Sequence, residues 1–466
     1  MTDIAPVLAE ADAALPSSLE TLFDLIRIKS ISTDPGYKQD CRAAAEFLVA
    51  QLKSIGFDAS VRDTSGHPMV VAHHDGATAD APHVLFYGHY DVQPVDPLNL
   101  WHDDPFTPSV KEHPETGRKV ITGRGSADDK GQLMTFVEAC RAYKKAAGSL
   151  PLKVTILFEG EEESGSPSLK PFLDANAEEL KADFALVCDT NMWDADTPAI
   201  SAGLRGLVGE EITITAADRD LHSGYFGGAA ANPIHVLTTI LAAMRDETGR
   251  ITIPDFYDGV EETPSQIKQS WDKLGRTAEA FLGEVGLSKL AGEQDRSVLE
   301  LTWARPTAEV NGIWGGYTGE GFKTVIAAEA HAKVSFRLVG EQDPAAIRRN
   351  FRAFVEARVP EDCKVSFHEH GGSPAIQLPY DSPLLNTAKD ALTGEWPKPA
   401  VMIGMGGSIP IVGDFQKMLG MDSLLIGFGL ADDRIHSPNE KYELTSFHKG
   451  IRSWIRVMDA LARQPA

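Results

Sequence analysis

The stretch HVLFYGHYDV at residues 83–92 decides the fold, because it is a short apolar run that ends in a histidine and an aspartate. Two similar runs follow, LKVTILFEG at 152–160 and DFALVCD at 183–189, and a segment with helical spacing at 132–147 separates the first two runs. Apolar runs of this length predict buried strands, and strands that alternate with helices predict an α/β fold. We therefore expect a mixed or mostly parallel sheet with helices on both faces.

The segments before and after this stretch have different patterns, and those after it predict a second domain. From 19 to 55, apolar residues recur at helical spacing around the turn TDPGY, which predicts two helices. By contrast, LVGEEITITAA (207–217) and TVIAAEAHAKVSFRLV (324–339) alternate apolar and polar residues, as strands with one solvated face do. A chain of 466 residues also exceeds what one hydrophobic core usually organises.

The order of these patterns predicts an inserted domain. Residues 250–305 show no readable pattern. The first pattern returns near the C-terminus, so we expect an α+β domain at 200–373 inserted into a discontinuous α/β domain made of 1–199 and 374–466. Further elements are predicted as helices at 233–246, 344–358, 383–392 and 445–461 and as a strand at 423–428.

The composition excludes several classes of partner. The chain has 44 basic and 67 acidic residues and a formal net charge of -23, which disfavours nucleic acid and anionic membranes. The N-terminal segment is acidic and lacks the apolar core of a signal peptide, and no apolar run approaches the ~20 residues that span a bilayer. The 4 cysteines are far apart and form no CxxC pair, which disfavours a thiolate zinc site. We expect reduced thiols and a cytoplasmic location.

The end of the first strand carries residues that suit a metal site. The strand period of two places His89 and Asp91 on the same side at the C-terminal end, where α/β sheets place their ligand sites. His89 can ligate a metal while Asp91 accepts the proton of the other ring nitrogen. Alone, an HxD pair is more often a histidine that is merely hydrogen-bonded at a strand end.

A glycine-rich loop supplies two more carboxylates. GRGSADDKG (123–131) places Asp128 and Asp129 between glycines, immediately before a helix. Asp128 can cap that helix, which is the usual role of an aspartate at such a position. Two neighbouring carboxylates in such a loop also suit a bridging ligand that offers one oxygen to each of two ions. Both interpretations are open on these residues alone.

Acidic residues gather after the second strand, where FEGEEESGS (158–166) contains four glutamates, Glu159, Glu161, Glu162 and Glu163. Such a run is usually a solvated loop. Here it sits at the same sheet edge as the histidine, and two cations at that edge would neutralise it.

Two later strand ends add to the constellation. The strand DFALVCD ends at Asp189, and His436 in RIHSPNE follows the strand SLLIGFG. An aspartate at a strand end is by itself a common turn former. Together, however, these strand ends deliver histidine and carboxylate groups without cysteine, which indicates a catalytic rather than a structural zinc site.

At this point the sequence resembles the M20 metallopeptidases, and within them the group of cytosolic non-specific dipeptidases and carnosine dipeptidases. The resemblance spans nearly the whole chain. It implies a zinc-peptidase-like catalytic domain and makes the inserted domain a lid and dimerisation domain. The motifs that recur in family order are GHYDV, GRGSADDKG, EEESGS, the strand-ending Asp189, DLHSGYFGG, RLVGEQDP, GGSIP and HSPNEKYE.

The resemblance implies a ligand set that the residues alone do not sort. His89 and Asp189 would bind one ion, Glu163 and His436 would bind the other, and Asp128 would bridge them. Zn²⁺ is the expected metal, with Mn²⁺ and Co²⁺ as alternatives. The Asp128–Asp129 peptide bond is cis in many members of the family.

The resemblance also implies how an amide bond would be cleaved. A hydroxide that bridges the two ions would attack the scissile carbonyl, with Glu162 as the general base that later protonates the leaving amine. Asp91 would orient His89 from behind. The expected substrates are dipeptides or short peptides with a free C-terminal carboxylate.

Residues of the inserted domain would complete the site by the same resemblance. His222 in DLHSGYFGG would reach across a dimer interface and stabilise the oxyanion in the partner's site, so a homodimer is expected. Arg337 of SFRLVG and Ser408 of GGSIP would grip the terminal carboxylate of the substrate. Thr324 and Asn311 would line the same pocket.

Two alternatives stay in view. An N-acyl amino acid amidohydrolase of the same superfamily would use identical chemistry, although such deacylases more often show HAGxxP where this chain has HSGYFGG. A non-catalytic protein that binds metal or peptide would require a broken site, and every motif position expected for catalysis is filled.

Overall fold

The computed structural model describes residues 3–407 and 410–463. The chain divides into two compact units. The first contains the described residues of Met1–Ala202, Leu378–Ile403 and Asp414–Ala466, and the second those of Gly203–Gln377 and Gly404–Gly413. Within the described residues, every helix is too short or too polar to cross a membrane.

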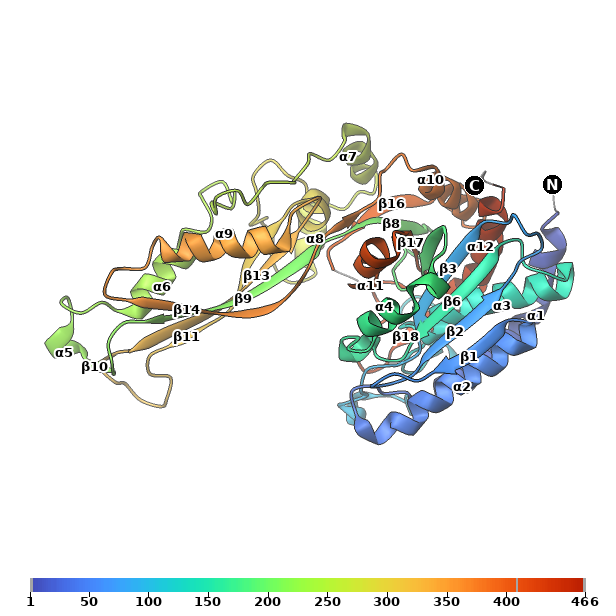
Figure 1. Ribbon diagram of the computed structural model, residues 1–466, viewed down its shortest axis with the longest axis horizontal. Coiled ribbons are helices and arrows are strands. Elements are labelled where there is room, and N and C mark those ends of the chain that lie inside the picture. Colours follow the sequence, from blue (N-terminus) through green and yellow to red (C-terminus); the bar gives the residue numbers. More distant parts are fainter. Residues whose placement is uncertain (1–2, 408–409, 464–466) are drawn as a thin grey trace. The chain divides into compact units, whose positions relative to one another are not determined.

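The first unit is built on a large mixed sheet (Figure 1). Its strands run in the order β1, β2, β6, β3, β7, β17, β8, and β16 pairs with β8. Four neighbours at the centre, β6, β3, β7 and β17, are parallel, whereas β1, β2 and β8 pair antiparallel. The bounds are β1 Asp58–Arg62, β2 Met69–His74, β3 His83–His89, β6 Lys153–Glu159, β7 Phe184–Val187, β8 Ala199–Leu204, β16 Val401–Met405 and β17 Asp422–Ile426.

Helices cover both faces of this sheet. Neighbouring side chains on a central strand point to opposite faces, so the contacts of Phe86 and Tyr87 report what packs on each face. On one face Phe86 of β3 stacks on Phe136 with ring centroids 3.8 Å apart, and Trp454 meets both rings edge-on. On the other face Tyr87 meets Phe415 at 5.9 Å. Burial on both faces explains why these strands read as continuous apolar runs. The expected α/β fold with a mixed sheet flanked by helices is confirmed.

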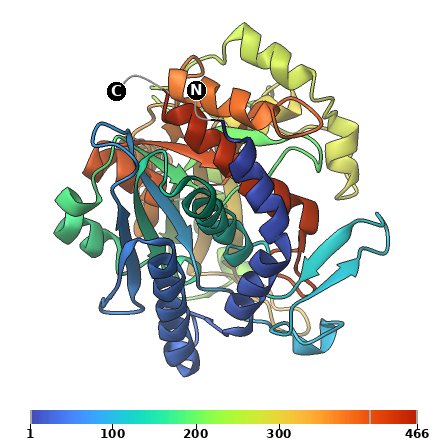
Figure 2. The same cartoon turned by 90° about the vertical axis from the view of Figure 1, so that its right-hand side faces the viewer.

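The helices of the first unit pack in groups. α1, α3 and α12 contact one another, α10 packs on α12, and Figure 2 shows α1 beside α12. α2 packs on β1 and β2, and α4 packs on β6. The bounds are α1 Ala5–Arg27, α2 Lys38–Ile55, α3 Lys130–Ala147, α4 Leu169–Leu180, α10 Pro383–Thr393 and α12 Leu444–Leu461, with short 3₁₀ helices η1 Pro35–Tyr37, η2 Leu98–Leu100 and η3 Glu162–Ser164 and a short π-helix η5 Phe415–Leu419. The short helix α11 Pro410–Asp414 belongs to the second unit except for its last residue.

The first helix begins earlier than its apolar spacing predicts. The pattern starts at residue 19, whereas α1 begins at Ala5 and includes Pro16. The added segment is rich in alanine, which has the highest helix propensity, but it buries only small contacts such as Val7 and Ala11. A helix held mostly by propensity leaves little periodic signal in the sequence.

A small antiparallel sheet flanks the large one in the first unit. Its strands run in the order β18, β5, β4. The bounds are β4 Ser109–Glu112, β5 Lys119–Thr122 and β18 Lys441–Glu443. Because β5 leads into the loop GRGSADDKG and β18 follows HSPNE, this sheet brings two of the sequence motifs side by side.

The second unit is an antiparallel sheet with helices on one face. Its order is β11, β13, β9, β14, and a separate pair joins β10 to β12. Inward residues such as Val208 and Phe336 form its core under α6 and α9, as the alternating patterns predict. The bounds are β9 Gly206–Thr215, β10 Leu221–His222, β11 Thr307–Gly315, β12 Val325–Ile326, β13 Glu329–Leu338, β14 Lys364–Ser373, β15 Ile376–Gln377, α5 Ser223–Phe226, α6 Pro233–Ala242 and α9 Pro344–Glu356.

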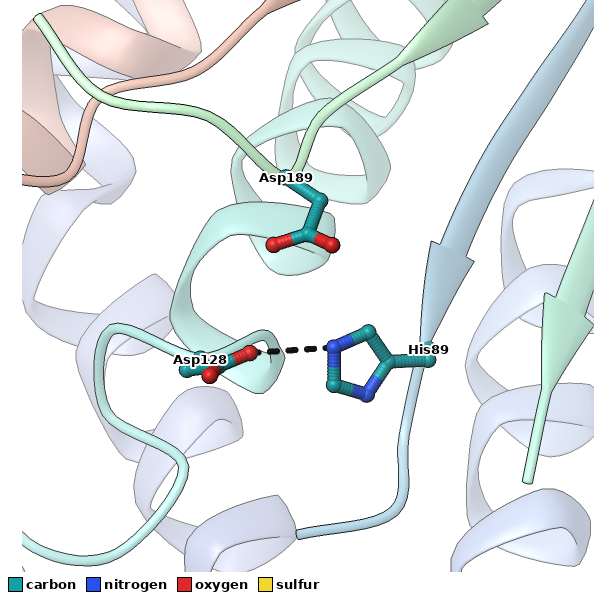
Figure 3. A group of neighbouring side chains, drawn as sticks. All are labelled: His89, Asp128 and Asp189. Atoms are coloured by element: carbon teal, nitrogen blue, oxygen red, sulfur yellow. Dashed lines mark hydrogen bonds and ion pairs between the residues drawn. The ribbon is translucent and has the colours of Figure 1, made fainter. Parts of the chain in front are cut away.

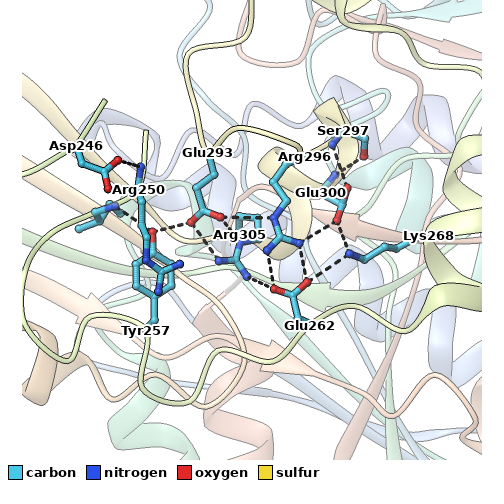
Figure 4. Close-up of polar contacts among 11 residues, drawn as sticks. Asp246, Arg250, Tyr257, Glu262, Lys268, Glu293, Arg296, Ser297, Glu300 and Arg305 are labelled. Carbon is cyan, nitrogen blue, oxygen red and sulfur yellow. Dashed lines mark hydrogen bonds and ion pairs between the residues drawn. The ribbon is translucent and has the colours of Figure 1, made fainter. Parts of the chain in front are cut away.

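An ion-pair network holds the segment that had no readable pattern (Figure 4). Glu262 accepts two 2.6 Å hydrogen bonds from Arg296 and one of 3.3 Å from Lys268. Glu293 accepts bonds of 2.8 and 3.1 Å from Arg305. The helices of this segment are short, with bounds α7 Ser265–Asp272, α8 Ala278–Gly283 and η4 Glu300–Ala304. The segment is therefore ordered mainly by ion pairs between side chains, which leave no periodic pattern in the sequence.

Candidate metal centre

Four neighbouring parallel strands bring the predicted ligands to one edge of the large sheet. His89 is the last residue of β3, Glu163 follows β6, Asp189 follows β7, and His436 lies on the loop after β17. The carboxyl ends of parallel strands meet at the same edge, which is where α/β sheets bind their ligands. Asp128 joins them from the loop between β5 and α3.

These five residues form two groups that share one carboxylate. Ligand atoms of His89, Asp128 and Asp189 lie within 4.8 Å of one another, and so do those of Asp128, Glu163 and His436 (Figure 3 draws the first group). Asp128 presents Oδ1 to Nε2 of His89 at 3.0 Å and Oδ2 to Nε2 of His436 at 3.0 Å. Oε2 of Glu163 lies 3.1 Å from the same nitrogen of His436.

The donor set fits two divalent ions of zinc type. It consists of imidazole and carboxylate groups without thiolate, and each group of three leaves room for water, as in catalytic zinc sites. Two ligand atoms on one tetrahedral zinc lie about 3.4 Å apart, given bonds of about 2.1 Å. The contacts of 3.0 and 3.1 Å are therefore close to the spacing that an ion between them requires.

The electrostatics of the groups also favour cations. Burial raises the pKa of the Asp189 carboxyl well above its ordinary value, and the charge of Asp128 adds to the effect. Hydrogen bonds to Asp128 and Glu163 raise the pKa of His436 to about 10. The chain alone therefore concentrates more negative charge here than it stabilises, and bound cations would offset that charge.

Asp91 fixes the orientation of His89 from behind. Nδ1 of His89 lies 3.1 Å from the carbonyl oxygen of Asp91 and 3.4 Å from its Oδ1, which leaves Nε2 facing the shared carboxylate. The two carboxylate oxygens of Asp91 also accept the backbone N–H groups of Glu162 and Glu163, at 3.2 and 3.1 Å. Asp91 therefore ties the glutamate turn to the histidine, a contact that the HxD spacing alone does not reveal.

The four glutamates of FEGEEESGS have different surroundings in the structure. Only Glu163 among these four belongs to a candidate metal group of the described residues. Glu162 lies next to it, and burial raises the pKa of its carboxyl. Glu161 turns away and accepts backbone N–H bonds from His67 at 2.8 Å and from Ser168 at 3.1 Å. Sequence reasoning missed this anchoring role because ligand, base and anchor are the same residue type in one run.

The aspartate loop resolves a second ambiguity. The N-cap residue of α3 is Asp129, and no side-chain capping bond is formed there, while both oxygens of Asp128 face histidines. Oδ2 of Asp129 accepts the backbone N–H of His89 at 3.1 Å, an approach that requires glycine at 88 because a Cβ there would lie 2.8 Å from this oxygen. The Asp128–Asp129 peptide bond is cis.

The predicted residues of the second unit fall at two separate places. His222 and Thr324 lie together, since β10 pairs with β12 and the N–H of Ser223 donates to the carbonyl of Thr324 at 3.1 Å. Nδ1 of His222 accepts the N–H of Gly224 at 3.0 Å, which puts the ring proton on Nε2. Arg337 lies near the other end of β13, opposite Leu207.

The remaining two predictions for this unit have different outcomes. Asn311 forms the β-bulge of β11 between Val310 and Gly312, so it lies partway along the sheet. Ser408 lies outside the described residues. From Glu329 to Arg337 the strand β13 spans roughly 26 Å at about 3.3 Å per residue. The strand β10, which contains His222, lies beyond the start of β13 (Figure 1), and Thr324 lies beside it, so both residues are remote from Arg337 within one chain.

Comparisons with known proteins agree with this site. A family model described as peptidase family M20/M25/M40 matches residues 85–460. The chain is 31% identical over 470 residues to a Cys-Gly metallodipeptidase of Candida albicans, covering 97% of this chain and 96% of that protein. It is 27% identical over 436 residues to the human Beta-Ala-His dipeptidase, covering 92% and 83%. The solved M20 metallo-carboxypeptidase of Sulfolobus solfataricus superposes with a TM-score of 0.79 at 28% identity, covering 96% and 99%.

Proposed function

Because the chain belongs to the peptidase family M20/M25/M40, we propose that it hydrolyses the amide bond of dipeptides or short peptides that carry a free C-terminal carboxylate. The family makes it a hydrolase, and the similarity to dipeptidases over nearly the whole chain supports the substrate class. The observation that carries the proposal is Asp128, whose two oxygens face two different histidines at 3.0 Å.

Two divalent ions would occupy the two groups. His89 and Asp189 would hold one ion, Glu163 and His436 the other, and Asp128 would bridge them. Zn²⁺ suits this mixture of imidazole and carboxylate, and Mn²⁺ and Co²⁺ are the alternatives. When bound, such ions polarise the scissile carbonyl and lower the pKa of a water molecule toward neutrality.

The chain's own residues would move the proton and hold the geometry. Glu162 would accept a proton from the attacking water at its carboxylate and deliver it to the leaving amine. Glu162 is half-buried, and burial raises the pKa of its carboxyl above the ordinary value, which favours a group that accepts a proton and passes it on. Asp91 would keep His89 in one tautomer and would hold the turn that carries Glu162 and Glu163.

The second unit would bind the substrate carboxylate and stabilise the oxyanion. Arg337 would pair with the carboxylate together with Ser408, and Asn311 would line the pocket. Thr324 lies beside His222, so it would enter the same pocket from the partner chain together with that histidine. His222 would donate from Nε2 to the oxyanion, and the tautomer in the structure supports this role. A dipeptide is far shorter than the roughly 26 Å span of β13, so His222 and Arg337 of one chain cannot both contact one substrate molecule.

We therefore propose a homodimer in which His222 acts in the partner's site. The edge strand β11 supports an interface in this unit, since Val310, Ile313 and Trp314 are 44%, 51% and 42% exposed. An apolar sheet edge of this kind is normally covered in the functional protein. The four cysteines are buried free thiols, which supports a reducing compartment such as the cytoplasm.

A substrate panel tests the proposal. We expect the protein loaded with Zn²⁺, Mn²⁺ or Co²⁺ to hydrolyse dipeptides, to lose activity on the same peptides with an amidated C-terminus, and to act weakly on N-acetyl amino acids. Cleavage confined to N-acetyl amino acids would establish the deacylase alternative instead. Two bound ions with no hydrolysis of any amide would favour a non-catalytic protein. Glu162→Ala should bind two ions and lose nearly all turnover of these peptides. Glu115→Ala, which changes an exposed glutamate in the turn between β4 and β5, serves as its matched control.

A further inference from the structure

Two of the three residues in the second candidate metal group, which consists of Asp128, Glu163 and His436, come from two loops that a buried ion pair joins. The aspartate loop (123–129) carries Asp128, and the histidine loop (433–441) carries His436. Arg124 of the first loop donates from Nη1 to Oε2 of Glu440 of the second at 2.7 Å. The two side chains are 2% and 0% exposed, so this pair is shielded from water and from screening by salt. The sequence motifs contain both residues but assign neither a role.

Glu440 binds the backbone of the aspartate loop as well as Arg124. Oε1 accepts the N–H groups of Ala127 at 2.9 Å and Asp128 at 3.1 Å, and Oε2 accepts the N–H of Gly125 at 2.9 Å. Successive backbone N–H groups that converge in this way form an anion-binding nest. Gly125 has φ of +83°, a left-handed conformation that glycine adopts without strain. The loop is thus folded around one carboxylate.

The histidine loop is closed at its base by a second pair. Nζ of Lys441 donates to Oδ1 of Asp433 at 2.7 Å, and the backbone N–H of Lys441 donates to the carbonyl of Asp433 at 3.0 Å. Glu440 therefore sits at a fixed point of a closed loop, four residues after His436. A force that holds Glu440 in the nest of the aspartate loop also fixes the loop that carries His436.

From these contacts we infer that Glu440 is a positioning residue for the second metal ion, because it sets the distance between Asp128 and His436. This inference rests on the proposed function only in so far as the two groups bind ions. Asp128 and His436 come from segments more than 300 positions apart, and Glu440 is the side chain that binds the backbone N–H of Asp128 directly. A ligand pair drawn from two loops binds an ion tightly only when the loops are held in place before the ion arrives.

Only a carboxylate fits this position. Each oxygen of Glu440 accepts two donors, one oxygen from Ala127 and Asp128 and the other from Gly125 and Arg124. Glutamine would replace one oxygen with an NH₂ group. In either orientation of the amide, that NH₂ group would face two donors and accept neither. Glu440→Gln keeps the size of the side chain and yet disrupts half of the contacts.

The test measures metal binding and does not depend on catalysis. Metal-free wild type, Glu440→Gln and His436→Ala are titrated with Zn²⁺ against a chromophoric chelator, and Co²⁺ absorption spectra report the geometry of each ion. His436→Ala marks the step that belongs to the second ion. We expect Glu440→Gln to weaken that step by about 10- to 100-fold, the usual effect of removing a residue that orients a ligand, and to affect the first step less.

Glu395→Gln is the matched control for the loss of a buried carboxylate. Glu395 is 8% exposed and accepts bonds of 2.7 Å from Arg452 and from Arg456, within the same unit. Both variants should lower the midpoint of thermal unfolding of the metal-free protein, but only Glu440→Gln should lower the affinity for the second ion. The inference would be overturned if Glu440→Gln lowered the affinity for both ions equally, or if both variants lowered the affinity for the second ion. Either result would give Glu440 a general structural role only.

A conservative variant keeps the inference testable if Glu440→Gln does not fold. Glu440→Asp keeps the charge but is one methylene shorter, so it cannot meet both pairs of donors, and it too should weaken the second ion by at least about 10-fold. Wild-type affinity for both ions in a folded variant would refute the inference and leave the proposed peptidase activity intact. Conversely, two ions in wild type with no amide hydrolysis would remove the proposed function and leave the role of Glu440 standing.

Discussion

A heterodimer with Glu162→Ala in one chain and His222→Ala in the other is expected to recover about half of the wild-type turnover, because a symmetric dimer has two equivalent sites. In the proposed arrangement each site combines Glu162 of one chain with His222 of the other. The His222→Ala chain keeps its own Glu162 and receives an intact His222 from its partner. The opposite site lacks both groups.

The proposal that His222 acts between chains rests on the length of β13. Arg337 lies near the end of β13, whereas His222 lies in the separate β10–β12 pair before the start of that strand, so roughly 26 Å of strand separates the two residues. A dipeptide held by Arg337 cannot extend to the histidine of the same chain. If both residues contact the substrate as proposed, the histidine would have to come from a second chain, whatever the position of the second unit relative to the first.

The assay uses two affinity tags, so that sequential purification yields only heterodimers. A second heterodimer pairs a wild-type chain with a chain that carries both substitutions. In the proposed arrangement this heterodimer is inactive, because the one intact Glu162 meets a partner without His222. If His222 served its own chain, the results would be reversed, with no turnover in the first heterodimer and about half in the second. That reversal would refute the reasoning.

Three further outcomes are expected. Glu162→Gln should bind two ions with wild-type affinity and lose about 10²- to 10⁴-fold in kcat, and a kcat near the wild-type value would remove Glu162 as the base. Asp91→Asn should weaken metal binding by about 10- to 100-fold in a chelator competition, since one amide N–H of the glutamate turn loses its acceptor, and unchanged affinity would contradict that role. Arg296 lowers the pKa of Glu262 from 4.5 to about 2, so the stabilisation by this pair is present above pH 4.5 and is lost as the pH falls toward 2. Because Glu262 is mostly exposed, the effect should be under about 1 kcal/mol, and hydrogen exchange of 262–305 should show it in wild type but not in Glu262→Gln.

The sequence predicts the large sheet well because the physical cause is local. Strands β3, β6 and β7 are buried on both faces, and such strands must be continuously apolar. Their polar ends are then conspicuous, which is why His89 and Asp189 stand out in the sequence as candidate ligands. The family resemblance to the M20 peptidases is likewise confirmed.

Other features have causes that are not local. The segment 262–305 is ordered by pairs such as Glu293 with Arg305, 12 positions apart, and long-range charge pairs leave no periodic pattern. The described residues of 404–413 group with the second unit, although they lie between segments of the first in the sequence. A segment of ten residues is too short to show a distinct composition or periodicity, so nothing in the sequence distinguishes it from the residues on either side.

Acidic residues around the site divide into two classes that only the structure separates. Some face the candidate ions, and others hold the backbone of the loops that carry the ligands. Asp91 accepts the amides of the glutamate turn, Asp129 accepts the amide of His89, and Glu440 accepts the amide of Asp128. A buried carboxylate suits this second task because it binds several N–H donors at once and more strongly than a neutral acceptor does. The ligand geometry would then be set by backbone amides before any ion binds, and the surplus of carboxylates near the site follows from that requirement as much as from the ions.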